Sequence, residues 1–124
     1  MSNVQKWGYA SFGVGLVLAA GCYIGFAAAS GAGVKTTLLV AATVFTVAAA
    51  NGLGVGIADS VTTGKWVGLI VGAVGFVAWG IAWLATSGAL KDSFGWAAVF
   101  AAIAALASML PELFGGSSAP ATTN

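Results

Sequence analysis

The sequence has very little charge. Only 6% of its 124 residues are Asp, Glu, Lys or Arg, whereas 60% are hydrophobic. Soluble globular domains carry charge on roughly 25% of their residues. Four cations and three anions cannot cover a protein of this size in water, but they can cover the two rims of a protein whose middle lies in lipid. The composition therefore predicts an integral membrane protein, in a cell membrane or in a virion membrane.

Histidine and arginine are absent, and Cys22 is the only cysteine. Without histidine there is no imidazole general base and no histidine ligand for haem or zinc. Without arginine there is no guanidinium to hold phosphate or carboxylate groups. A net charge of +1 removes the main electrostatic contribution to nucleic-acid binding. We therefore predict a protein that is not an enzyme and that binds no metal, cofactor or nucleic acid.

Long apolar runs are abundant. Four of them, each close to the ~20 residues that cross a bilayer, contain no charge except at the end of the fourth. They cover residues 7–29, 37–58, 66–86 and 94–114. Backbone in lipid must satisfy its own hydrogen bonds, so each run predicts a helix, the fourth with Asp92 or Ser93 as its N-cap. The predicted fold is an all-α, four-helix transmembrane bundle over residues 1–114, followed by a polar tail, residues 115–124.

Tryptophan lies near the predicted ends of the spans. Trp7 and Trp66 fall on the side of the amino terminus, and Trp83 and Trp96 fall on the opposite side. Tryptophan is enriched at membrane–water interfaces, because its ring is apolar and its N–H is polar. We interpret these four residues as interfacial anchors. Trp79 lies one helical turn from Trp83, and this pair is interpreted as lipid contact or packing rather than as a ligand platform.

The two halves of the sequence resemble each other. Matching positions include Lys6-Trp7 with Lys65-Trp66, Gly13 with Gly72, Gly21 with Gly80, Ser30-Gly31-Ala32 with Ser87-Gly88-Ala89, Lys35 with Lys91, and Val44-Phe45 with Val99-Phe100. This repeat predicts a tandem duplication of a two-helix hairpin, with both copies in the same orientation. Two such hairpins packed face to face make a four-helix bundle.

Small residues recur every four positions in all four spans. In membranes, helices associate through close backbone packing, which small residues permit. The predicted helix-packing positions are Gly21, Gly25 and Ala29 in the first span, Ala50 and Gly54 in the second, Gly64, Gly68 and Gly72 at the start of the third, and Ala97, Ala101 and Ala105 in the fourth. Four such stripes in one small chain indicate dense packing, and they favour self-association.

Few polar side chains lie within the spans. Asn51 is the most polar of them, and its amide needs a partner in lipid; with Thr43 and Thr46 it forms either a clasp to a neighbouring helix or the lining of a narrow polar path. Asp59 lies at the end of the second span, where its charge opposes the helix dipole. A loop hydroxyl, Lys65 or a cation could relieve that unfavourable interaction.

Two functions fit these observations. The first is a non-catalytic structural or assembly subunit that packs with itself or with a larger partner, as in a virion membrane, a pilus-like structure or a multisubunit membrane complex. The alternative is a small passive channel or transporter for a neutral or small solute. Size and four spans resemble small multidrug exporters in outline, but those proteins use a carboxylate within the first span, and residues 7–29 contain none.

Membrane orientation depends on the Lys and Arg residues of short loops. Both termini and the central loop share one side, which holds Lys6 and Lys65, while Lys35 and Lys91 lie on the other. The two sides are therefore balanced, and only the amino-terminal ammonium favours one of them. We expect the termini to be mainly cytoplasmic, or interior in a virion.

Overall fold

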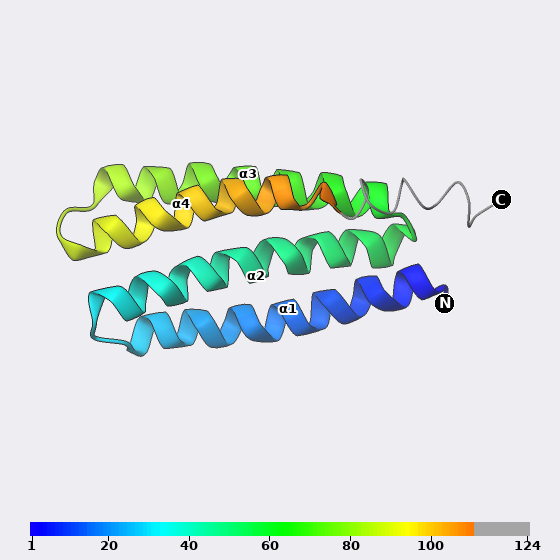
Figure 1. The fold of residues 1–124 in the computed structure, drawn as a ribbon, viewed down its shortest axis with the longest axis horizontal. Helices are drawn as coiled ribbons and strands as arrows, with labels where there is room; N and C mark the ends of the chain where they lie inside the picture. Colours follow the sequence, from blue (N-terminus) through cyan, green and yellow to red (C-terminus); the bar gives the residue numbers. More distant parts are fainter. Residues whose placement is uncertain (111–124) are drawn as a thin grey trace.

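The computed structural model describes residues 1–110, and these residues form an all-α protein. Its helices are α1 (Asn3–Ala28), α2 (Ala32–Ala58), α3 (Val61–Ala85) and α4 (Ala89–Ala107). They run up and down and are joined by short turns (Figure 1). All four are long and apolar enough to cross a membrane. The predicted four-helix membrane bundle is confirmed. The end of the predicted fourth span and the predicted tail, residues 111–124 together, lie outside the described residues.

The helices begin earlier than the apolar runs. The predicted ends of the first three spans agree with the helices to within one residue, but each predicted start is four or five residues late. Hydropathy marks where lipid begins, whereas a helix begins at its cap. At α1, Ser2 Oγ accepts the Gln5 backbone N–H at 3.0 Å, and the Gln5 side chain accepts the Ser2 N–H at 3.2 Å. At α3, Ser60 Oγ accepts the Thr63 N–H at 3.3 Å.

The predicted N-cap of the fourth helix is wrong. α4 begins at Ala89, after Gly88, whose φ of 84° lies in the left-handed region that glycine tolerates. Asp92 lies in the first turn, where a carboxylate is favoured by the helix dipole. Ser93 lies inside the helix, is buried, and shares a 2.7 Å hydrogen bond with Thr36 of α2. Its hydroxyl therefore links two helices instead of capping one.

α2 occupies the centre of the bundle. It packs against α1 on one side and against α3 and α4 on the other, whereas α1 has extensive contact with α2 alone. Figure 1 shows α1 at the edge of the molecule, with α2 between it and the α3–α4 pair. Burial follows this arrangement, because α2 contains Leu39, Ala42 and Val47 of the core, while Ala19 is the one core hydrophobic residue on α1 among those described. The bundle is therefore open along α1.

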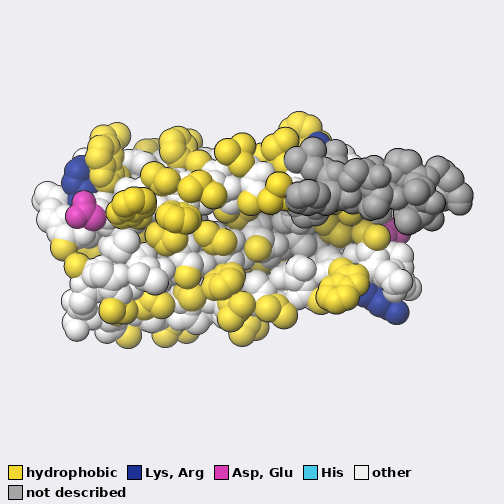
Figure 2. Space-filling view, in the orientation of Figure 1, with side chains coloured by type: hydrophobic (Ala, Val, Ile, Leu, Met, Phe, Trp, Pro, Cys, Tyr) yellow, Lys and Arg dark blue, Asp and Glu magenta, His cyan; other side chains and the backbone are white. Residues whose placement is uncertain are grey.

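The surface is apolar along the length of the helices. In Figure 2 hydrophobic side chains spread over the visible face, while Lys and acidic side chains lie at the two ends. Fully aliphatic side chains such as Val17 and Leu84 are more than 70% exposed. Contiguous apolar surface of this extent is unfavourable in water and favourable in lipid. With the four spanning helices, it makes the chain an integral membrane protein.

Candidate functional site

The contact between α1 and α2 brings backbone against backbone. A Cβ added to Gly8 would stand 2.5 Å from the backbone nitrogen of Gly56 and 2.8 Å from the carbonyl oxygen of Gly52. A Cβ added to Gly52 would stand 2.6 Å from the carbonyl oxygen of Gly8. Farther along, a Cβ on Gly15 would stand 3.0 Å from Ala49 Cβ. At Gly8 and Gly52 only glycine fits without a shift of the helices, so the two backbones are in direct contact.

The small residues predicted for the first span lie largely outside this contact. Gly21 faces outward, with nothing within 4 Å of an added Cβ. Gly25 touches only the end of the flexible Leu38 side chain, at 3.1 Å. Ala29 is the C-cap of α1. The buried small residues of α1 are instead Gly8, Gly15 and Ala19.

The glycines predicted at the start of the third span lie between α3 and its two neighbours. A Cβ added to Gly64 would stand 2.8 Å from the carbonyl oxygen of Asn51 on α2. A Cβ added to Gly72 would stand 2.9 Å from the carbonyl oxygen of Ala101 on α4. Gly68, between them, faces both α2 and α4. The remaining predicted positions are Gly54, buried against Gly64 and Val67; Ala97, Ala101 and Ala105, buried on α4; and Ala50, half-buried on α2.

The predicted polar residues of α2 face three different helices. Thr43, 3% exposed, accepts a hydrogen bond from Trp79 Nε1 of α3 at 3.1 Å and donates to the carbonyl of Leu39 at 2.8 Å. Thr46 shares a 3.3 Å hydrogen bond with Tyr23 of α1. They therefore do not line one common path.

Asn51 links α2 to α4. Its Nδ2 donates to the carbonyl of Ser108 at 3.4 Å, which satisfies one of the last carbonyls of α4. A cavity of about 250 Å³ beside it is lined by Ser11, Val47 and Ala104 among others. The Asn51–Ser108 and Thr36–Ser93 pairs both join positions 57 apart, as do the repeated Ser30 and Ser87. Hydrogen-bonded residues of the parallel helices α2 and α4 are therefore separated by the same number of positions as the repeated Ser30 and Ser87.

The end of α2 is held by the start of α1. Asp59, the C-cap of α2, has a left-handed φ of 51° and accepts a hydrogen bond from Ser2 Oγ at 2.5 Å. Gln5 Nε2 donates to the carbonyl of Gly56 at 3.1 Å. The hydroxyl against the carboxylate thus belongs to the N-cap of α1. Sequence reasoning named a loop hydroxyl, Lys65 or a cation as partners for Asp59 and did not identify Ser2.

The turns of both hairpins contain the same lysine arrangement. Lys35 Nζ donates to the carbonyl of Phe26 at 2.7 Å and lies 4.8 Å from the centre of that residue's ring. Lys91 Nζ donates to the carbonyl of Trp83 at 2.7 Å and lies 4.0 Å from its ring centre. In each turn a cation reaches back to the C-terminal end of the preceding helix, where it is favoured by the dipole and by the aromatic face. The match of Lys35 with Lys91 in the repeat corresponds to this shared geometry.

The four predicted anchors all lie near helix ends with large exposed surfaces. The exposed fractions are 74% for Trp7, 56% for Trp66, 40% for Trp83 and 54% for Trp96. Trp79 is different, because it points into the bundle and stacks on Phe94 with ring centres 5.6 Å apart. The packing interpretation of Trp79 therefore corresponds to what the structure shows, whereas its hydrogen bond to Thr43 could not be read from spacing.

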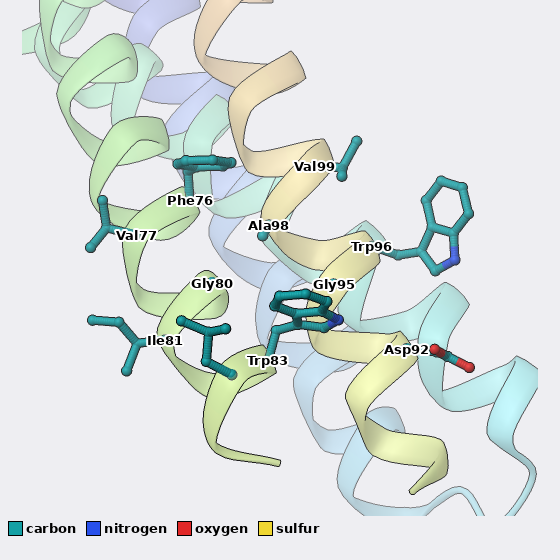
Figure 3. A pocket seen from close by; sticks show the side chains of 11 residues that line it. Phe76, Val77, Gly80, Ile81, Trp83, Asp92, Gly95, Trp96, Ala98 and Val99 are labelled. Atoms are coloured by element: carbon teal, nitrogen blue, oxygen red, sulfur yellow. The ribbon is translucent and has the colours of Figure 1, made fainter. Parts of the chain in front are cut away.

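A large hollow lies between α3 and α4. It has a volume of about 670 Å³ and opens on the outside of the bundle. Figure 3 shows Trp83 lying across the gap beside Gly95, with Asp92 and Trp96 projecting from α4. A Cβ on Gly95 would stand 2.9 Å from Trp83 Cδ1, so this glycine makes room for the indole. Asp92 lines this hollow, and its neighbour Lys91 contacts Trp83 of the α3 wall. We call the hollow, with Lys91 and Asp92 at its rim, the α3–α4 groove.

These features define a small four-span integral membrane protein whose helices pack through glycine and alanine. The chain matches no protein-family model, and no curated protein or solved structure is similar to it. The described residues contain no group of three or more His, Cys, Asp or Glu side chains that could hold a metal ion.

Proposed function

We propose that the protein is a non-catalytic structural or assembly subunit of a membrane, and that it packs with copies of itself or with a larger partner through the outer face of α1. The observation that carries this proposal is the position of α1, which has extensive contact with α2 alone. Its outward side includes Gly13 and Gly21, each with nothing within 4 Å of an added Cβ. Exposed glycines allow a second helix to approach closely, which is how membrane helices associate.

The packing inside the bundle also supports this choice of face. The predicted stripes of the third and fourth spans are used between helices of the same chain, as the close contacts of Gly64, Gly68 and Gly72 indicate. They are therefore not free to contact another molecule. Among the described helices, α1 has two glycines with open space around them, whereas α2 and α3 have one each, Gly33 and Gly80; α1 also has exposed apolar side chains, including Val14 and Val17.

Crosslinking in lipid tests this proposal. Gly13→Leu combined with Gly21→Leu should reduce crosslinked oligomers about tenfold, because two bulky side chains keep a partner helix away. Gly80→Leu is the matched control, since Gly80 also has open space around it but lies on α3. Oligomers that survive the double substitution, or that are lost equally in the control, would contradict the proposal.

The alternative, a passive channel for a small neutral solute, has weaker support. Thr43, Thr46 and Asn51 face α3, α1 and α4 respectively, so their polar groups do not form a continuous line. Specific solute flux into liposomes that is abolished by Asn51→Leu would favour the channel over the structural subunit.

The proposed location is a cell membrane or a virion membrane, with the termini cytoplasmic or interior. Lys6 and Lys65 on the terminal side balance Lys35 and Lys91 on the other, so the orientation should invert easily. Lys6→Gln with Ala89→Lys should invert a large fraction of molecules, measured with a reporter fused after Asn124. A uniform wild type whose double variant keeps the same orientation would show that lysine balance does not set the topology.

A further inference from the structure

We propose that the α3–α4 groove binds one phospholipid with a primary-amine head group, its acyl chain lying in the groove and its phosphate and ammonium lying at Lys91 and Asp92. This inference is independent of the proposed structural role, because it concerns the opposite side of the bundle from α1. It rests on the shape of the groove and on the pair of charges at its rim.

The groove runs from the rim into the membrane. Its α3 wall extends from Leu84, in the last turn of the helix, to Phe76, eight residues deeper. At 1.5 Å per residue this corresponds to a depth of about 12 Å. The volume of about 670 Å³ lies within the ~300–1,000 Å³ typical of small-molecule sites. An elongated apolar molecule that enters from head-group level fits this geometry.

The floor of the groove is formed by residues that lack long side chains. Gly80 on α3 and Ala98 on α4 leave the space, Gly95 admits the Trp83 indole, and larger side chains such as Phe76 and Val99 flank the hollow. An apolar hollow open to the bilayer cannot stay empty without losing dispersion contacts along its walls. The surrounding medium supplies acyl chains, so a lipid chain is the natural occupant.

The rim carries one charge of each sign. Lys91 Nζ uses one of its N–H groups on the Trp83 carbonyl, which leaves donors for a phosphate. Asp92 is exposed, lines the groove, and accepts no hydrogen bond from another described residue that would occupy its carboxylate. A head group with a phosphate next to an ammonium is complementary to this pair, because the phosphate can accept from Lys91 and the ammonium can donate to Asp92.

The carboxylate also distinguishes between kinds of amine. A primary amine can donate N–H bonds to it, which a quaternary ammonium cannot. The Trp83 ring is not available for cation binding on the face that Lys91 covers.

The other hairpin turn provides an internal comparison. Lys35 lies over Phe26 as Lys91 lies over Trp83, but the residue after Lys35 is Thr36, which is bonded to Ser93. That turn therefore has the cation without the carboxylate. Of these two described turns, the one between α3 and α4 alone has the carboxylate that the proposed amine contact needs.

The proposal is tested by native mass spectrometry of the full chain, released from bilayers containing equal amounts of phosphatidylethanolamine, phosphatidylcholine and phosphatidylglycerol. We expect the wild type to retain one phosphatidylethanolamine about fivefold more often than either other lipid. Gly80→Leu should reduce this adduct about fivefold, because nothing within 4 Å of an added Cβ prevents the new side chain from filling the groove. Asp92→Asn should remove the preference for phosphatidylethanolamine over phosphatidylcholine.

Two controls belong to the experiment. Gly33→Leu makes the same change in open space on α2 and should leave the adduct unchanged. Lys35→Gln should likewise have no effect, whereas Lys91→Gln should weaken retention. Equal retention of all three lipids by the wild type, or equal effects of Gly80→Leu and Gly33→Leu, would overturn the proposal. Preferential retention of phosphatidylglycerol would overturn it too, as would protein dimers that are lost only in Gly80→Leu.

Discussion

The two hairpins use small residues in different ways. Between α1 and α2, glycines lie on both helices, and Gly8 meets the backbone of Gly52 and Gly56. Between α3 and α4, glycines on α3 meet alanines on α4, as at Gly72 and Ala105. The first contact therefore places glycine backbone against glycine backbone, whereas the second places glycine backbone against alanine. A similar composition thus produces two different kinds of close helix contact.

The α3–α4 hairpin also carries aromatic packing that α1–α2 lacks among the described contacts. Trp79 stacks on Phe94 with the ring planes 12° apart, and its Nε1 reaches across to Thr43 of α2. This side chain connects the second hairpin to the central helix. Among the described residues, α1 has no extensive contact with α4, and the bundle is open on that side. The comparison separates a peripheral helix held by one neighbour from a pair fixed to the core.

The largest expected effect comes from filling the glycine positions of α3. Gly68→Leu with Gly72→Leu should destabilise the fold by about 4 kcal/mol or more, because overpacking costs about 1–3 kcal/mol at each site and here the backbone and Ser108 are in the way. The measurement is the free energy of unfolding in mixed micelles. Val71→Leu, a half-buried neighbour, should change it by less than about 1 kcal/mol. Equal behaviour of the two variants would refute the assignment of this interface.

A smaller substitution distinguishes the two hairpins directly. Gly8→Ala should cost about 2 kcal/mol, because its Cβ would meet backbone atoms of α2 from 2.5 Å, and those atoms cannot move separately from the helix. Gly75→Ala on α3 is the control, since its Cβ would meet only Ala101 Cβ, at 3.3 Å, and alanine favours the helix. The same unfolding measurement should find it within about 0.5 kcal/mol of the wild type. A larger loss at Gly75 than at Gly8 would reverse the comparison.

Hydropathy was enough to predict the four helices, because backbone in lipid has few alternatives. Hydropathy could not show which small residues of α1 contact α2, because glycine and alanine occur on every face of that helix. The predicted stripe repeats every four residues, whereas Gly8, Gly15 and Ala19 follow the spacing of about 3.5 that is typical of left-handed helix packing. A search for small residues that repeat every seven positions would have found Gly8 and Gly15.

The sequence indicates which polar side chains need a hydrogen bond, but it does not identify the residues that supply it. Asn51 needed a hydrogen bond in lipid, yet only the fold shows that Ser108 receives it. Ser93 looked like a cap because it lies beside Asp92 near a turn, and its pairing with Thr36 depends on how the two hairpins meet. The α3–α4 groove depends on the positions of Gly80 and Gly95 across from each other, which sequence spacing does not determine.

The link from the second hairpin to α2 should have a moderate effect. Trp79→Phe keeps an aromatic ring against Phe94 but removes the donor to Thr43, and it should cost about 1 kcal/mol of unfolding free energy. Trp96→Phe is the control, because Trp96 is exposed and should change stability by less than about 0.5 kcal/mol. Combining Trp79→Phe with Thr43→Val should be less harmful than the sum of the two single changes. Additive losses would show that the hydrogen bond contributes nothing.

The smallest expected effect concerns the two turns, where the hairpins are most alike. Lys35→Met and Lys91→Met each remove a donor to a helix-end carbonyl, at 2.7 Å in both turns, and a cation over an aromatic ring. Each should cost about 0.5 kcal/mol, because a cation near a helix C-terminus and an exposed cation–π contact are each worth about that much and are partly replaced by water. Lys91→Met should cost slightly more, since the Lys91 ammonium lies closer to its aromatic ring than the Lys35 ammonium does, at 4.0 Å against 4.8 Å.

Both lysines belong to the same side of the membrane, so the two variants alter the charge balance equally and differ only in local contacts. Arginine at either position should restore stability. A measurable loss in one turn and none in the other would show that the two hairpins share a sequence pattern without sharing its energetic role.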